Sequence, residues 1–331
     1  MARIFQTGLE TGSVDPLTTI ATVNTTLETT VTRGSWSSYA AKIGTSSGYA
    51  HWTLGAGYGE FYMGFGFHTG SISAIDTLTC RSPDGTVQCS LEYGASGQLL
   101  ALRGTTTTLG SGGQLVANTW HWIECHIIIS NTVGEFTVKL DGVQVINVTG
   151  ADTQAHASET TVQTLRFEGS VAPHYFDDIV INDTTGAQNT SWPGDVRVSG
   201  YTPNADGDVS GLTLSTGTSH YAVVDERPPN DATDYAYDSV VNDYDLLNIP
   251  NTSGISSVQA VTLWLRAQKS DAGAANIAHM LKSGATEDTG SDVALSTSWT
   301  YHGKVYNVDP TDSGAWTTGK LDALQIGAKC R

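Results

Sequence analysis

The sequence predicts an all-β protein built from two β-sandwich domains. Charged residues make up only 15% of the 331 residues, and Gly, Ser, Thr and Asn are frequent. This composition is typical of turn-rich sheet proteins, because helical surfaces normally contain more Lys and Glu. Apolar and polar residues alternate at a period of two along much of the chain, which indicates strands with one wet face. The sequence contains neither a long amphipathic helical pattern nor a repeat of fixed period.

The stretch from Trp120 to Val148 gives the clearest strand pattern. Residues 123–129 are almost all apolar, as expected for a central strand covered on both sides. After a short polar turn, Phe136, Val138 and Leu140 alternate with polar residues. A meander of this kind needs a second sheet to cover its apolar face, which predicts a β-sandwich.

A hairpin turn is expected within this stretch at Asp141-Gly142. These two residue types supply the positive φ angles that a type I′ turn requires. If the turn forms, Leu140 faces Val143 and Val138 faces Val145. One face of the hairpin would then be apolar throughout.

Residues 58–68 are expected to form another strand, with two unlike faces. One face is apolar and consists of Phe61, Met63, Phe65 and Phe67. Gly64 and Gly66 lie on the other face, where they could leave a flat sugar-binding surface. The alternative, which we favour, is that a packed loop or a bend in the sheet approaches the strand closely there.

A domain boundary is expected near residues 187–200, where turn residues become frequent. This places one domain at 1–190 and a second β-sandwich domain at 191–331. One helical turn is predicted at Thr317–Ala323. The further strands predicted are 161–168, 175–183, 221–224, 258–267, 277–282, 294–301 and 324–328.

The formal charge of −17 is spread evenly, with 16 acidic and 7 basic residues in 1–187 and 17 and 9 in 188–331. A uniformly acidic surface repels phosphate backbones and anionic lipids, so neither a nucleic-acid nor a membrane partner is expected. The first residues contain no apolar signal core, and no run is long enough to cross a bilayer. Synthesis in a cytosol, without export by the usual route, is therefore expected.

Cys80 and Cys89 flank a predicted hairpin loop. A four-residue loop, Pro83 to Thr86, places both sulfurs on the same face of the hairpin without requiring an N–H from Pro83. A disulfide between Cys80 and Cys89 is geometrically allowed, but two reduced, buried thiols are the favoured interpretation in a cytosol. The sequence contains no Cys-X-X-Cys, so zinc is not indicated.

Four aspartates are candidates for a calcium site. Asp177 and Asp178 are adjacent, and Asp206 and Asp208 lie in a segment that resembles part of a calcium loop. The later acidic ligand that such a loop needs is missing. Solvated turn aspartates are therefore the default interpretation, and no cofactor is expected.

The sequence gives no positive indication of catalysis. Its nine histidines are scattered, and no Ser/His/Asp arrangement or phosphate-binding loop can be singled out. Glu124 is the only acid in the central run, so the carboxylate pair needed for glycoside hydrolysis is not visible. The expectation is that the chain is not an enzyme. The tryptophans considered for stacking on sugar rings are Trp36, Trp52, Trp299 and Trp316.

Three motifs resemble a pattern frequent in concanavalin A-like (laminin-G-type) jelly-roll domains. They are Trp120-X-X-Ile-Glu, Gly134-X-X-X-Val-X-Leu-Asp-Gly and Asp177-Asp-Ile-Val-Ile-Asn-Asp. The resemblance implies that the first domain is a jelly roll of this kind. Glucanases of the same class use a Glu-X-Asp-X-X-Glu strand, which this sequence lacks.

The rest of the chain resembles a two-domain family of tailed-phage and prophage virion proteins. The motifs are Gly194-Asp-Val-Arg-Val, Thr202-Pro-Asn-Ala-Asp-Gly-Asp, Val224-Asp-Glu-Arg-Pro-Pro-Asn-Asp, residues 258–269 and residues 315–329. The resemblance covers essentially the whole chain and brings no catalytic residue with it. It implies a structural protein exposed on the particle, as a capsid decoration or accessory protein or a tail component.

The partners that this resemblance implies are other virion proteins, either major capsid or tail proteins. Self-association is expected because virions are symmetric. The expected location is the virion, after synthesis in the host cytoplasm. Two alternatives remain open: a carbohydrate-binding adhesin or receptor-binding tail protein and, more remotely, a glycoside hydrolase.

Overall fold

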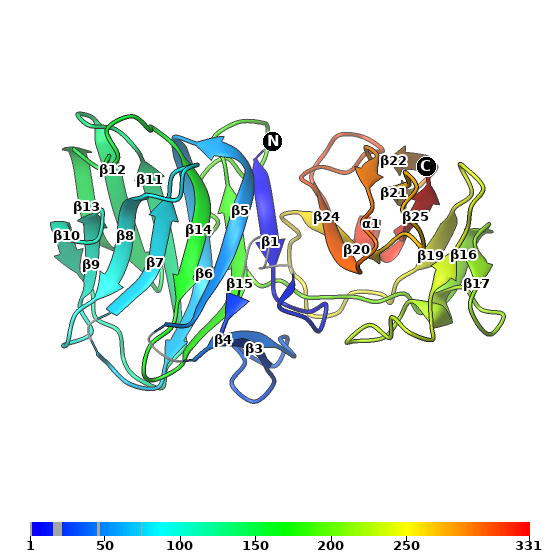
Figure 1. The fold of residues 1–331 in the computed structure, drawn as a ribbon, viewed down its shortest axis with the longest axis horizontal. Coiled ribbons are helices and arrows are strands. Elements are labelled where there is room, and N and C mark those ends of the chain that lie inside the picture. The colour runs from blue at the N-terminus through cyan, green and yellow to red at the C-terminus, as the bar shows by residue number, and fades with distance from the viewer. Residues whose placement is uncertain (1, 16–21, 45–46, 74) are drawn as a thin grey trace. The chain divides into compact units, whose positions relative to one another are not determined.

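The computed structural model describes residues 2–15, 22–44, 47–73 and 75–331, and it is all-β with two β-sandwiches (Figure 1). The chain divides into two compact units. The first unit comprises Met1–Leu9 and Val14–Ser199, and the second comprises Glu10–Ser13 and Gly200–Arg331. Among the described residues, no helix is both long and apolar enough to cross a membrane.

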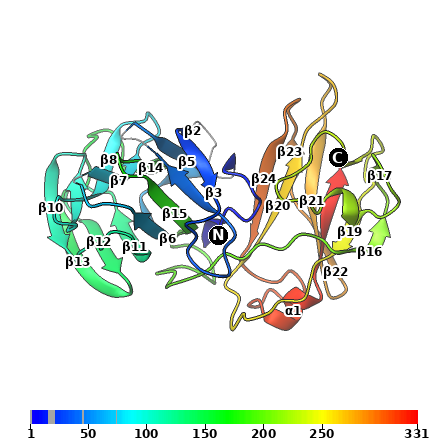
Figure 2. The same cartoon turned by 90° about the horizontal axis from the view of Figure 1, so that it is seen from below.

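The first unit consists of two antiparallel sheets stacked face to face, as the two views show (Figures 1 and 2). Sheet A has eight strands, in the order β13 (Val143–Ala151), β12 (Gly134–Leu140), β11 (His121–Ile128), β6 (Glu60–Thr69), β15 (His174–Asn182), β4 (Ala40–Ile43) and β3 (Thr25–Glu28), with β1 (Arg3–Thr7) also paired to β15. Sheet B has seven strands, in the order β10 (Thr107–Gly112), β9 (Leu99–Arg103), β8 (Val87–Tyr93), β7 (Ile75–Arg81), β14 (Val162–Glu168), β5 (Tyr49–Tyr58) and β2 (Thr22–Val23).

The core of this unit lies between the inner faces of the two sheets. The four apolar residues of β6 are fully buried, as their alternation predicts. Phe65 and Phe176 of sheet A both contact Phe167 of sheet B, and Phe176 also contacts Phe65 and Phe67, with ring centroids 5.0–5.9 Å apart. Burying each such ring stabilises the fold by about 1.5–3 kcal/mol, so this aromatic cluster holds the two sheets together.

The expected hairpin forms between β12 and β13. Asp141 and Gly142 adopt φ angles of 51° and 80°, and Leu140 pairs with Val143. The next pair differs from the prediction, because a bulge places Val138 opposite Ile146 rather than Val145. The extra residue turns Ile146 into the core, while Val143 remains 65% exposed, so the hairpin face is not apolar throughout.

The second unit contains a six-stranded sheet and two strand pairs. The large sheet has the order β16 (Ala205–Ser210), β19 (Asp245–Asn248), β25 (Gln325–Cys330), β21 (Asn276–Ser283) and β22 (Thr286–Thr289), with β23 (Val293–Ala294) also on β21. The pairs are β17 (Thr213–Leu214) with β18 (Ala236–Tyr237), and β20 (Val261–Ala267) with β24 (Thr300–Tyr306).

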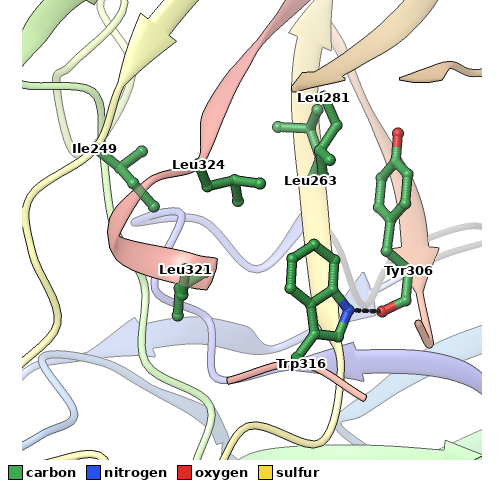
Figure 3. Close-up of a cluster of buried hydrophobic side chains, with 7 residues drawn as sticks. All are labelled: Ile249, Leu263, Leu281, Tyr306, Trp316, Leu321 and Leu324. Carbon is green, nitrogen blue, oxygen red and sulfur yellow. Dashed lines mark hydrogen bonds between the residues drawn. The ribbon is translucent and has the colours of Figure 1, made fainter. Parts of the chain in front are cut away.

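The core of the second unit is a cluster of seven buried side chains (Figure 3). They are Ile249, Leu263, Leu281, Tyr306, Trp316, Leu321 and Leu324. Trp316 Nε1 donates to the carbonyl of Tyr306 at 2.8 Å, which fixes the indole in the cluster. Leu321 comes from α1 (Thr318–Asp322), the helical turn that the sequence predicts at this point.

Residues 221–224, expected as a strand, instead begin with a 3-10 turn, η2 (Tyr221–Val223). Val223 is buried, and its neighbour Val224 is 41% exposed. A run of four apolar or small residues is compatible with either structure, and the alternation alone could not decide between them.

Candidate functional site

The outer face of sheet A is covered at its centre by a segment of the chain. We call residues 192–198 the covering segment. A methyl group added at Gly64 would lie 2.5 Å from Trp122 Cζ2 and 2.9 Å from Pro193 Cγ, and one added at Gly66 would lie 2.5 Å from Arg33 Cδ. The two glycines therefore permit close packing, as favoured from the sequence, rather than forming an open sugar-binding surface.

Arg33 fastens the covering segment to the sheet. Its Nη1 donates to Asp178 Oδ2 and to the carbonyl of Val196, both at 2.8 Å, and its Nη2 pairs with Asp195. The guanidinium also lies 4.4 Å from the centre of the Trp122 ring. The Arg33 side chain is only 7% exposed, so these contacts are largely shielded from water.

Asp177 and Asp178 belong to this attachment and not to a calcium site. A bulge in β15, where Asp178 has a φ of 50°, lies at this pair. Asp178 Oδ1 accepts the N–H of Val198 at 2.7 Å, and Asp177 Oδ2 accepts the hydroxyl of Ser37 at 2.8 Å. Calcium needs six to eight oxygen ligands, whereas these carboxylates face N–H, O–H and guanidinium donors, so the calcium interpretation is not supported.

The environment of this pair favours protonation of Asp177. Burial, followed by the neighbouring Asp178 carboxylate, raises the pKa of Asp177 to about 8. Burial also raises the pKa of Asp178, which the Arg33 guanidinium opposes. Glu124 lies nearby under the covering segment, accepts the N–H of Gly194 at 2.8 Å, and has its pKa raised by burial.

Asp206 and Asp208 lie on β16 in the second unit and also have other partners. Asp206 Oδ1 accepts the N–H of Tyr221 at 2.8 Å. Asp208 pairs with Lys282 and accepts from Gln325 Nε2 at 3.0 Å. The Lys282 ammonium at the Asp208 carboxylate disfavours binding of a second cation there. Within the described ranges, no group of three His, Cys, Asp or Glu side chains is arranged to hold a metal.

Cys80 and Cys89 lie directly opposite each other on β7 and β8, in the register expected from the loop. Both are fully buried free thiols, so the allowed disulfide is not formed in this structure. The hydrogen bond with the Cys89 thiol, followed by burial, raises the pKa of Cys80 well above its usual value, which disfavours the reactive thiolate.

The tryptophans considered for sugar stacking are mostly engaged. Trp52 stacks on Phe5 with ring centroids 3.8 Å apart. The Arg197 guanidinium lies 3.7 Å above Trp36, and Trp316 is buried in the second core. Trp299 lies beside Tyr235 at 6.2 Å.

A cluster of ionisable and aromatic side chains lies beside the covering segment, and the sequence did not reveal it. His126 contacts Glu60 Oε1 through Nε2 at 2.9 Å and Glu135 Oε2 through Nδ1 at 3.0 Å. Its ring stacks on Tyr62 at 4.0 Å, with Trp192 edge-on to Tyr62 at 5.4 Å. Three strands supply the acids and the imidazole, so their proximity depends on the strand order β12-β11-β6.

The outer face of sheet B contains a shallow pocket. Its volume is about 240 Å³, and His51 of β5, Arg81 of β7, Thr164 of β14 and the loop residues Pro83, Asp84 and Gly85 line it. The pocket is slightly smaller than sites for drug-sized ligands, which measure roughly 300–1,000 Å³, so it suits one small ring or group. This pocket is the candidate functional site.

Strand pairing brings the lining residues together. Strand β14 lies between β5 and β7, so that Arg166 is opposite both His51 and Thr79, and Thr164 is opposite Arg81. Arg81 Nη1 donates to the carbonyl of Gly85 at 2.9 Å, and its Nε donates to Thr79 Oγ1 at 3.2 Å. These contacts fix the guanidinium at the pocket wall before any ligand binds.

Asp84 is held at the pocket by its own loop. Its Oδ1 accepts from Ser82 Oγ at 2.6 Å and from the N–H of Thr86 at 3.0 Å, and its Oδ2 lies 3.2 Å from His156 Nε2. The Ser82 hydroxyl and the Thr86 N–H lower the pKa of Asp84 to about 2, so it is ionised at neutral pH.

The electrostatic environment of His51 is positive. Burial first, and then the charges of Arg166 and Arg81, lower the pKa of His51 to about 4, so the ring is neutral at pH 7. Neither ring nitrogen has a hydrogen-bond partner within the described part of the chain. The pocket wall therefore combines a neutral imidazole, a fixed guanidinium and an ionised carboxylate.

No protein-family model matches this sequence, and no curated protein is similar to it. The structure is similar to a Bacillus subtilis protein of unknown function with a galectin-like fold, at 8% identity and a TM-score of 0.39, covering 55% of this chain and 96% of that one. It is also similar to Trypanosoma rangeli sialidase, at 13% identity and a TM-score of 0.33, covering 43% of this chain and 25% of that one. A third similar structure is a variant of the alginate lyase Aly36B bound to an alginate trisaccharide, at 11% identity and a TM-score of 0.33, covering 43% of this chain and 80% of that one.

This chain thus spans about a quarter of the sialidase that it matches. These likenesses concern the β-sandwich architecture alone and bring no ligand or site residue to this chain. They do correct one expectation, that the chain is not an enzyme, because a sialidase and an alginate lyase are among the similar structures. That expectation depended on the missing glucanase motif and on the absence of a visible carboxylate pair, and both criteria concern glycoside hydrolysis only.

Proposed function

We propose that the chain is an exposed structural protein of a tailed-phage particle, located on the head or in the tail. The proposal rests on the sequence motifs that resemble two-domain virion proteins. One structural observation supports it: the virion-type motif at residues 194–198 contacts the jelly-roll motif at residues 177–183. Asp178, from the jelly-roll motif, pairs with Arg33 and accepts the N–H of Val198, while Arg33 also binds Asp195 of the virion-type motif.

This contact gives the motifs a physical role. The Asp177-Asp178 pair lies in β15, the last strand of the first β-sandwich, and residues 194–198 are the last part of the first unit before the chain continues as the second unit. The two motifs therefore hold the end of the first unit against its β-sandwich, and a two-domain structural protein needs such an attachment. The even acidic charge of both units is consistent with an exposed protein that stays soluble at high copy number.

Analysis of purified particles tests this proposal. Particles produced with the gene intact should contain the chain at a fixed ratio to the major capsid protein, and antibodies against it should label their surface. A gene-deleted particle preparation provides the control. If the chain occurs only in the lysate and never on particles purified by density gradient, the proposal is wrong.

Glycan binding by the first β-sandwich is a second candidate function, and it is compatible with the first. The pocket on sheet B favours it, because Arg81, Asp84 and Thr164 offer both donors and acceptors beside the ring of Pro83. Such a mixture suits a sugar, which presents hydroxyl groups and a C–H face. A glycan array probed with the full chain should show binding that decreases in Asp84→Asn; an array without any signal argues against this function.

A further inference from the structure

We propose that the pocket on sheet B binds the carboxylate of an acidic sugar, such as a uronic acid or a sialic acid residue. This inference names the ligand class of the glycan-binding function proposed above and rests on that function. It does not depend on the virion location. The anchor that we assign is Arg81, with Asp84 and Thr164 contacting the hydroxyl groups of the ring.

The first argument is the geometry of Arg81. The planar guanidinium group suits carboxylates because it can form two parallel hydrogen bonds. In this structure, the Thr79 hydroxyl and the Gly85 carbonyl orient it at the wall of a 240 Å³ pocket. A pre-oriented guanidinium loses little side-chain entropy when a ligand binds.

The second argument is the local charge in a protein whose net charge is −17. Arg81 and Arg166 both act on His51, and both make a positive charge on its ring less favourable. The same positive potential attracts an anion into the pocket. Glu168 Oε1 lies 2.8 Å from Arg166 Nε and accepts the Thr79 hydroxyl at 3.2 Å, while Asp84 is held by its own loop and His156.

The third argument is the mixed character of the wall. A site for a simple inorganic anion would need only N–H donors and positive charge. Here Pro83 provides an apolar patch, Thr164 provides a hydroxyl, and Asp84 provides an acceptor. An ionised acceptor beside a guanidinium is suited to a ligand with both a carboxylate and hydroxyl groups, which describes an acidic sugar.

Ligand titrations followed by NMR of the histidine rings in the full chain test the proposal. The probes are methyl β-D-glucuronide and N-acetylneuraminic acid, compared with methyl β-D-glucoside, sodium acetate and inorganic phosphate. We expect at least one acidic sugar to bind at least tenfold more tightly than the glucoside and either simple anion. The bound carboxylate should also raise the pKa of His51 from about 4 by one unit or more, because it cancels the positive potential on the ring.

Arg81→Gln should weaken binding of the acidic sugar at least tenfold. Arg103→Gln is the matched control, because Arg103 lies on β9 of the same sheet and forms an exposed pair with Asp152. That variant should bind like the wild type. If Arg81→Gln fails to fold, the comparison of the acidic and neutral sugars with the wild-type chain still decides the question.

Three results overturn the inference, each with a different consequence. Equal binding of glucoside and glucuronide shows a neutral sugar site, which refutes the acidic class but retains glycan binding. Acetate or phosphate binding as tightly as the acidic sugars shows a simple anion site. Absence of any response at His51 refutes the pocket itself, whereas the particle analysis above still tests the virion proposal separately.

Discussion

The two outer faces of the first β-sandwich are built in opposite ways. On sheet A, Gly64 and Gly66 leave room for the covering segment and for Arg33, and Arg33 and the buried Asp178 hold that segment in place. On sheet B, long polar side chains from β5, β7 and β14 surround an uncovered pocket. The outer face of sheet A thus has glycines and serves a structural purpose. The outer face of sheet B has arginine and histidine side chains instead and is a candidate binding face.

The largest effect is expected from removing the buried charge on the covered face. Asp178→Ala leaves the Arg33 guanidinium without its buried partner and the Val198 N–H without an acceptor. The free energy of unfolding of the first unit should fall by about 3 kcal/mol, since breaking a buried ion pair strands the other charge. Urea denaturation of the full chain, followed by tryptophan fluorescence, measures this change.

Asp152→Ala is the control for this prediction. Asp152 pairs with Arg103 at 3.3 Å, but both side chains are well exposed. Exposed pairs contribute within about 1 kcal/mol, so this variant should unfold almost like the wild type. Similar losses in the two variants would show that the Arg33–Asp178 pair is not a structural attachment.

A smaller difference in stability is expected between valine substitutions of one glycine on each face. Gly64→Val forces a side chain against Trp122 and Pro193, which should destabilise the first unit by about 1–3 kcal/mol. Gly55, on β5 of sheet B, has no atom within 4 Å of the position that a Cβ would occupy, so Gly55→Val should change stability by less than about 0.5 kcal/mol. Denaturation midpoints of both variants test this, and equal effects would contradict the contrast between the faces.

The covered face should also make stability depend on pH. The folded-state pKa of Asp177 is raised to about 8, whereas an exposed aspartate titrates near 3.9. Between these values the folded state retains a proton that the unfolded state has released, so stability should decrease as pH rises from about 4 to 8. Relative to Asp177→Asn, the wild type should lose about 1.4 kcal/mol of stability per pH unit within this window, measured by urea midpoints at pH 5 and 8. A parallel pH profile in Asp177→Asn would refute the assignment.

Local patterns determined much of the fold, because a strand and its turn are encoded by neighbouring residues. The Asp141-Gly142 turn, the register of Cys80 with Cys89 and the buried face of β6 all follow from alternation and turn chemistry. The bulge at Asp177-Asp178 is also indicated by the spacing of apolar residues in the sequence. Phe176 and Ile179 are both buried although they are three residues apart, and a regular strand cannot place them on one face.

The candidate site could not be predicted in the same way. His51 and Arg81 come together only because β14 pairs with both β5 and β7, and that strand order is set by tertiary packing. The group formed by Glu60, His126 and Glu135 has the same origin in sheet A. Sequence spacing gives no information about which distant strands become neighbours, so these sites become visible only in three dimensions.

The smallest predicted effect concerns the edge of the covered face. Lys139 Nζ lies 3.9 Å from the centre of the Trp192 ring, at the start of the covering segment. Lys139→Met keeps the length of the side chain but removes the cation, so the first unit should lose about 0.5–1 kcal/mol. Limited proteolysis should then cut within residues 192–198 faster than in the wild type, because the segment is less firmly held. Lys42→Met, which removes a more distant cation at 5.9 Å from the Tyr175 ring, should leave that rate unchanged. Equal acceleration in both variants would mean that the Lys139–Trp192 contact does not help to hold the covering segment.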